Sequence, residues 1–108
     1  MSSTIAVIAR FIPRPESMQA LRVLLAAMTA PTRAEAGCRT YDLYESAGGG
    51  ELVLFERYRD HSALDEHRSS AHYRSYREKL PALLREPVAV TVLSPLDEGV
   101  ASERIQPR

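Results

Sequence analysis

The order of its predicted elements places this chain in the α+β class, with helices packed on a four-stranded antiparallel sheet. Four short segments are rich in β-branched and aromatic residues, and two stretches between them show apolar residues at helical spacing. A triple glycine joins the middle two strands. The order strand, helix, strand, strand, helix, strand is the ferredoxin-like βαββαβ pattern.

The first strand is expected at residues 4–12, TIAVIARFI, because β-branched residues favour extended backbone and Pro13 cannot donate to a sheet. A helix should begin at Pro15, since proline suits the first helical position. The apolar residues after it recur at helical spacing: Met18, Leu21, Leu25 and Met28. We expect this helix to bend or break near Pro31.

Two strands are expected at residues 38–45 and 51–59, forming a hairpin around the glycines at 48–50. The last strand is expected at residues 87–93, PVAVTVL, before Pro95. These segments complete the four strands of the sheet.

The second helical region follows the hairpin directly. Asp60 is a good N-cap for a helix that starts at His61, and Ser69 or Ser70 can cap a continuation. Pro81 should kink or end the helix because it lacks a backbone N–H.

Length and charge limit the classes of protein to consider. At 108 residues the chain suits one domain over residues 1–95, with a tail at 96–108 that is disordered or packed on a partner subunit. Fourteen Lys and Arg balance fourteen Asp and Glu, which disfavours nucleic acid and anionic membranes as partners. A small molecule fits better.

The cysteine and apolar patterns indicate a protein of the cytoplasm. Cys38 is the single cysteine, so no internal disulfide can form, and it is expected to be a packing residue. No segment approaches the roughly 20 apolar residues that a membrane helix needs.

The predicted sheet is apolar on both faces, which predicts a homodimer. Helices can cover one face, yet the first strand carries apolar residues at odd positions such as Val7 and at even positions such as Ile8. A second copy packed sheet to sheet would bury the other face. The alternative is that the C-terminal tail covers it.

Glu56 and His67 are the candidate catalytic pair. His67 shares a helical face with Ala63, Leu64 and Ala71, while Glu56 follows Leu54 at the strand period. One strand register therefore places the carboxylate beneath the helices, where it could orient the imidazole as a general base. The alternatives are a purely structural pair, or a register that exposes Glu56.

Four further residues are candidates for substrate binding: Tyr41, Tyr58, Tyr73 and His72. Amphipathic rings suit a flat aromatic ligand, although several tyrosines of such a domain serve only packing. His72 follows His67 by five residues, about 140° around a continuous helix, and no third ligand is spaced to join them. No metal site is therefore expected.

The stretches EAGCRTYDLY and LFERYRDHSALDEH, followed by a basic aromatic helix and a valine-rich strand, resemble the antibiotic biosynthesis monooxygenase domain, particularly its quinol-monooxygenase-like branch. The resemblance runs from about Ile5 to Pro95. It implies a dimeric α+β barrel, with a pocket between the sheet and helices of each subunit. It also implies that Glu56 and His67 are pocket residues.

The resemblance implies chemistry without a cofactor. Heme-degrading relatives use an asparagine, a tryptophan and an axial histidine, whereas this chain has neither Asn nor Trp, and Tyr58 stands where many relatives carry tryptophan. The leading hypothesis is a cofactor-independent monooxygenase that acts on a quinol, polyphenol or polyketide-like molecule with dioxygen. His67 would be the base, Glu56 its orienter, and Tyr41 or Tyr58 a hydrogen-bond donor.

Two other functions fit the same residues. One is a proton-transfer isomerase of a small phosphorylated metabolite, which needs Arg or Lys beside His67, with Arg39, Arg57 and Arg68 as candidates. The other is a non-catalytic dimeric module that binds small molecules.

Overall fold

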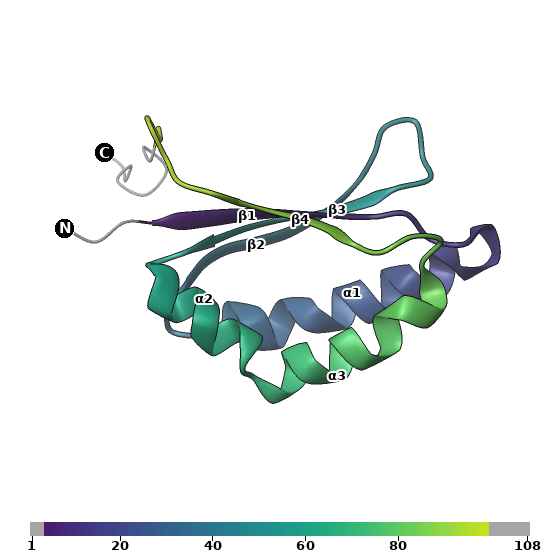
Figure 1. The fold of residues 1–108 in the computed structure, drawn as a ribbon, viewed down its shortest axis with the longest axis horizontal. Coiled ribbons are helices and arrows are strands. Elements are labelled where there is room, and N and C mark those ends of the chain that lie inside the picture. Colours follow the sequence, from purple (N-terminus) through teal and green to yellow (C-terminus); the bar gives the residue numbers. More distant parts are fainter. Residues whose placement is uncertain (1–3, 100–108) are drawn as a thin grey trace.

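The computed structural model describes residues 4–99, which form one antiparallel sheet with every helix of these residues on the same side (Figure 1). The sheet order is β2-β3-β1-β4. The strands are β1 (Ile5–Phe11), β2 (Cys38–Glu45), β3 (Leu52–Tyr58) and β4 (Ala89–Leu93). The helices are α1 (Met18–Arg33), α2 (His61–Arg68) and α3 (Ala71–Lys79), with 3₁₀ turns at Pro15–Ser17 and Leu80–Leu83. The predicted ferredoxin-like α+β fold is confirmed.

The helix ends show which local predictions hold. Asp60 caps α2 by accepting from the Ala63 backbone N–H at 2.9 Å, and Ser70 caps α3 by accepting from the Tyr73 N–H at 3.2 Å. The α3 helix ends just before the turn that contains Pro81, as expected. In contrast, α1 continues through Pro31 and ends at Arg33.

The helix-covered face of the sheet contains the core. Strand β1 runs beside β3 so that Val7 lies opposite Glu56 and Phe11 opposite Leu52, and all four side chains are buried. The buried apolar cluster continues into α1 and the turn after α3, with Leu21, Leu25, Met28, Leu80 and Leu84.

The opposite face of the sheet, here called the open face, has no described helix on it (Figure 1). Ile8, Val53 and Phe55 are only partly buried there, and Tyr44 is 56% exposed. The first residues of the predicted tail lie on this side, where Glu98 pairs with Arg57 of the same chain at 3.4 Å. The tail from residue 100 onward lies outside the described residues.

A bulge in β2 changes the face to which its side chains point. The pairing with β3 shifts between Cys38 and Thr40, so that Cys38 lies opposite Tyr58 and Tyr41 opposite Glu56. Strict alternation would put residues 38 and 41 on opposite faces. The bulge therefore places Tyr41, which is 2% exposed, on the helix-covered face.

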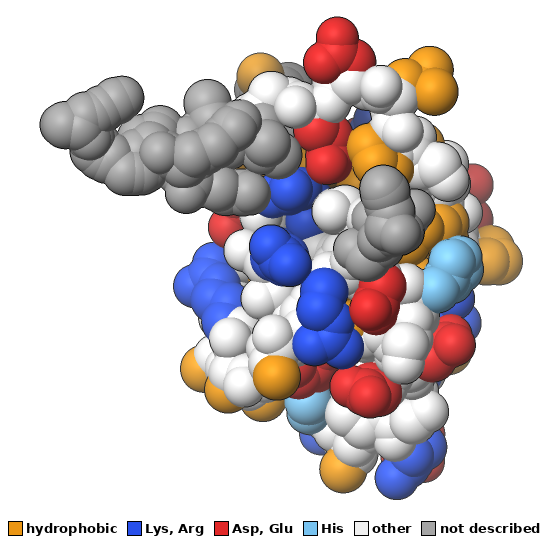
Figure 2. Space-filling view, turned by 90° about the vertical axis from the view of Figure 1, so that its left-hand side faces the viewer, with side chains coloured by type: hydrophobic (Ala, Val, Ile, Leu, Met, Phe, Trp, Pro, Cys, Tyr) orange, Lys and Arg blue, Asp and Glu red, His pale blue; other side chains and the backbone are white. Residues whose placement is uncertain are grey.

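Charged side chains of both signs are interspersed on the end of the molecule where α2 lies (Figure 2). This distribution matches the net charge of zero. Among residues 4–99, no helix has the length and apolar character to span a bilayer.

Candidate active site beneath helix α2

The two predicted catalytic residues are both buried beneath the helices. Glu56 is 6% exposed on β3, and His67 is 2% exposed in the last turn of α2. Strand alternation turns Glu56 toward the helices together with Leu54, while helical spacing turns His67 inward together with Ala63. The predicted strand register and helix face are confirmed.

The hydrogen bonds of these two residues correct the predicted pairing. His67 Nδ1 lies 2.9 Å from Glu35 Oε2, whereas Glu56 Oε1 accepts from the Tyr58 hydroxyl at 2.7 Å. The prediction that Glu56 orients His67 is therefore wrong, because Glu35 occupies that position. An ionised carboxylate only accepts, so His67 carries its proton on Nδ1 and keeps the Nε2 lone pair.

A close approach of backbone to helix brings Glu35 to His67. Glu35 lies in the loop between α1 and β2, and a Cβ added to Gly37 in this loop would lie 2.3 Å from the Ala63 Cβ of α2. Only glycine allows this separation. The Arg59 N–H also donates to the Gly37 carbonyl at 2.8 Å, which fixes the loop against the end of β3.

His72 joins the same carboxylate, against prediction. Its Nε2 lies 2.6 Å from Glu35 Oε2 and 3.3 Å from Ser70 Oγ. The 140° separation from His67 assumed a continuous helix, but α2 ends at Arg68 and α3 starts afresh after the Ser70 cap. The expectation that the two histidines diverge without a third ligand is wrong.

Three tyrosine rings surround the His67 imidazole. The ring centroids of Tyr41, Tyr58 and Tyr73 lie 5.9, 5.3 and 5.1 Å from that of His67. Tyr41 and Tyr58 are buried, and Tyr73 is partly buried. The structure thus brings all the predicted site residues to one place, and it adds Glu35, which sequence reasoning missed because no local pattern marks a loop carboxylate.

Burial shifts the protonation of the buried groups. It raises the pKa of Glu56 to about 7, although the Tyr58 hydrogen bond and the Arg68 charge act in the other direction. It lowers the pKa of His67, an effect that the Glu35 contact opposes. Burial also raises the pKa of Cys38 to about 11, which leaves this thiol protonated and unreactive at neutral pH.

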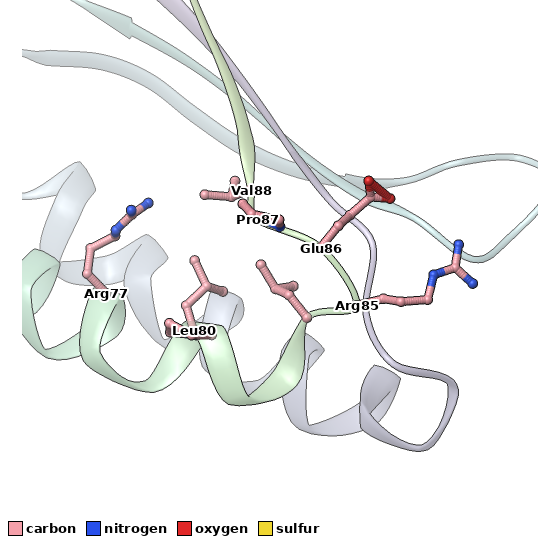
Figure 3. A pocket seen from close by; sticks show the side chains of 8 residues that line it. Arg77, Leu80, Arg85, Glu86, Pro87 and Val88 are labelled. Carbon is pink, nitrogen blue, oxygen red and sulfur yellow. The ribbon is translucent and has the colours of Figure 1, made fainter.

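A cavity of about 370 Å³ lies between the end of α3 and the segment leading into β4 (Figure 3). The side chains of Arg77, Leu80 and Val88 point into it, while Arg85 points away. Its remaining lining comes from Pro81, Leu84, Glu86 and Pro87. None of the predicted site residues lines this cavity, so the expected pocket residues and this cavity are separate features of the helix side.

Fold and site together define a class: a ferredoxin-like α+β domain with a histidine, carboxylates and tyrosines buried between its sheet and helices. The model of the antibiotic biosynthesis monooxygenase family matches residues 4–79 of this chain. The chain belongs to that family, as the sequence resemblance indicated.

Two relatives support the assignment. The protein named "Putative monooxygenase Rv0793" of Mycobacterium tuberculosis is 68% identical over 101 residues, covering 94% of this chain and 100% of that protein. The solved structure of Rv0793 matches with a TM-score of 0.89 at 69% identity, over 90% of this chain and 99% of that chain. The structure of PA3566 from Pseudomonas aeruginosa matches with a TM-score of 0.83 at 34% identity, over 90% and 98% of the two chains.

Proposed function

We propose that this protein is a monooxygenase that oxidises a quinol or a polyphenolic, polyketide-like small molecule with dioxygen. The observation that carries the proposal is the buried His67, whose Nδ1 is held by Glu35 at 2.9 Å within a ring of tyrosines. The family membership gives the reaction class, and these contacts suggest how the chain's own side chains would contribute to it.

His67 would act as the base. With its proton held on Nδ1 by Glu35, its Nε2 can take the hydroxyl proton of a phenolic substrate. The resulting phenolate is electron-rich and reacts with dioxygen. A quinol then becomes a hydroxyquinone: one oxygen atom bonds to the ring, and the other leaves as water with the two hydrogens that the ring and hydroxyls lose.

The surrounding groups suit an aromatic substrate better than a phosphorylated one. Tyrosine rings flank His67, whereas Arg57 lies on the open face near Glu98. Arg68, whose charge acts on both Glu56 and His67, is the feature that instead favours the phosphorylated substrate of the isomerase alternative. The Tyr58 hydroxyl donates its one proton to Glu56 at 2.7 Å, so it would stabilise developing negative charge on a substrate only by exchanging that acceptor.

Oxygen consumption with a panel of hydroquinones tests the proposal, using chelator-treated protein. We expect His67→Ala to lower the rate by about 10²-fold or more, because general base catalysis contributes on that scale. His61→Ala is the matched control, since His61 is exposed at the start of α2. If wild type and His67→Ala both consume oxygen at the uncatalysed rate, the proposal is wrong. A non-catalytic module that binds small molecules would then explain the structure better.

We also propose that two copies associate through the open face. Tyr44 is 56% exposed there, and Phe55 and Val53 are only partly buried. Such a surface favours a self-complementary two-fold contact. Light scattering should give the mass of a dimer for the wild type and of a monomer for Phe55→Glu, with Val23→Glu on the outer side of α1 as the control. A monomeric wild type would contradict this proposal.

A further inference from the structure

Three potential metal ligands converge at the junction of α2, α3 and the loop after α1. Glu35 Oε2 lies 2.9 Å from His67 Nδ1 and 2.6 Å from His72 Nε2. The ligand atoms of all three residues lie within 4.8 Å of one another. Both imidazoles thus point at a single carboxylate oxygen, although Glu35 is remote from them in sequence.

These separations are close to those of a coordination sphere. Bonds of about 2.0–2.2 Å to a transition metal place neighbouring ligand atoms roughly 3.0–3.5 Å apart. The Glu35 contacts at 2.9 and 2.6 Å would lengthen by about 0.1–0.9 Å to admit an ion.

The elements that hold the ligands are themselves fixed. His67 is 2% exposed in α2, and the Ser70 cap sets the start of α3, which carries His72. The contact of Gly37 with Ala63 fixes the loop of Glu35 against α2. Preorganised ligands of this kind lower the cost of assembling a metal site.

We propose that Glu35, His67 and His72 bind a divalent transition-metal ion such as Zn²⁺, Co²⁺ or Fe²⁺. Two imidazoles and one carboxylate favour these ions over Ca²⁺ and Mg²⁺, which prefer oxygen ligands. The Glu35 and His72 side chains are 20% and 26% exposed, so the ion is reached from solvent on that side. The remaining coordination positions of the ion are left for water or another oxygen ligand.

Metal binding would compete with the function proposed above. An ion on His67 Nδ1 moves the imidazole proton to Nε2, and the nitrogen assigned as the base then has no lone pair to offer. The same three residues would therefore exist in a metal-free state with a basic Nε2 and in a metal-bound state without one. This inference does not depend on the oxidation of a quinol, since it concerns a ligand of the free protein.

Titration of chelator-treated, full-length protein with Co²⁺ tests the site, followed by the visible d–d absorption of the bound ion. We expect saturation at one Co²⁺ per chain. Affinity should fall at least tenfold in His72→Gln and in Glu35→Gln, and it should stay unchanged in His61→Gln, which alters the histidine outside the cluster. Zn²⁺ should displace Co²⁺ and raise the Tm of the wild type more than that of His72→Gln.

Other results would overturn the site. Wild-type protein without saturable Co²⁺ binding would do so, as would equal affinities for wild type, His72→Gln and Glu35→Gln. Thermal melts in chelator show that each variant is folded before titration. The binding assay contains no quinol and the oxygen assay contains no metal, so either proposal can fail alone. In a separate oxygen assay with added Zn²⁺, binding of the ion without slower oxygen consumption would contradict the competition.

Discussion

The two ends of the helix-covered face of the sheet bury different kinds of side chain. One end, formed by α1 and the turn after α3, contains apolar side chains such as Phe11, Leu21 and Leu25. The other end, beneath α2, has a smaller apolar cluster and buries Glu56 and His67 beside it. Burying ionisable groups costs stability, and the hydrogen bonds of Glu56 and His67 offset only part of that cost. The apolar end thus offsets what the polar end costs.

Truncation in the apolar end should produce the largest loss of stability. Leu25→Ala removes a side chain with no exposed surface in α1 and should lower the free energy of unfolding by about 3 kcal/mol. Val23→Ala, in the same helix but 60% exposed, should change it by no more than about 0.5 kcal/mol. Urea unfolding at pH 7 measures both, and equal effects would contradict the assignment of the core.

The polar end should instead gain stability when its buried acid is replaced. The pKa of Glu56 is raised from an ordinary 4.5 to about 7, so the folded state binds more protons than the unfolded state between these values. The contribution of Glu56 to wild-type stability therefore falls as pH rises through this window, by about 3 kcal/mol. Glu56→Gln lacks this loss and should melt progressively higher than wild type from pH 5 to pH 8.

Glu66→Gln provides the control for that pH dependence, because Glu66 is an exposed carboxylate in α2. Its melting temperature should follow that of the wild type at every pH. A constant difference between Glu56→Gln and wild type would mean that the carboxyl group is ionised throughout the range.

The same contrast explains what could be predicted from the sequence. Strand alternation and helical spacing are local, so the burial of Glu56 and His67 followed from their neighbours Leu54 and Ala63. The fold class and the caps at Asp60 and Ser70 also followed from local chemistry. These features depend on a few consecutive residues.

The partners of the buried groups could not be predicted, because they depend on contacts between distant segments. Glu35 and His72 lie 37 positions apart and meet only because the loop after α1 passes beneath α2. The break between α2 and α3 and the bulge after Cys38 each change which way a side chain points. Periodicity assumes that neither irregularity is present.

Gly37 links the loop of Glu35 to the polar end, and enlarging it should be costly. In Gly37→Ala the new methyl would lie 2.3 Å from the Ala63 Cβ, so α2 or the loop must shift, at a cost of about 1–3 kcal/mol. Adding Ala63→Gly removes the opposing methyl. The double variant should therefore lose less free energy of unfolding than the two single variants lose together. Urea unfolding of all four proteins in a double-mutant cycle measures this difference. Additive effects would show that the two groups do not meet.

Removing the helix caps Asp60 and Ser70 should give the smallest loss of stability. Comparing the two variants separates an effect on a helix end from an effect on the candidate site. Asp60→Ala and Ser70→Ala each remove one cap and should each cost about 1 kcal/mol. Only Ser70 also touches the cluster, through Oγ at 3.3 Å from His72 Nε2. The imidazole nitrogen resonances of His72 should therefore shift in Ser70→Ala and stay in place in Asp60→Ala. Unchanged resonances in both variants would mean that the carboxylate of Glu35 alone sets the position of His72, and that the Ser70 cap serves the helix and not the site.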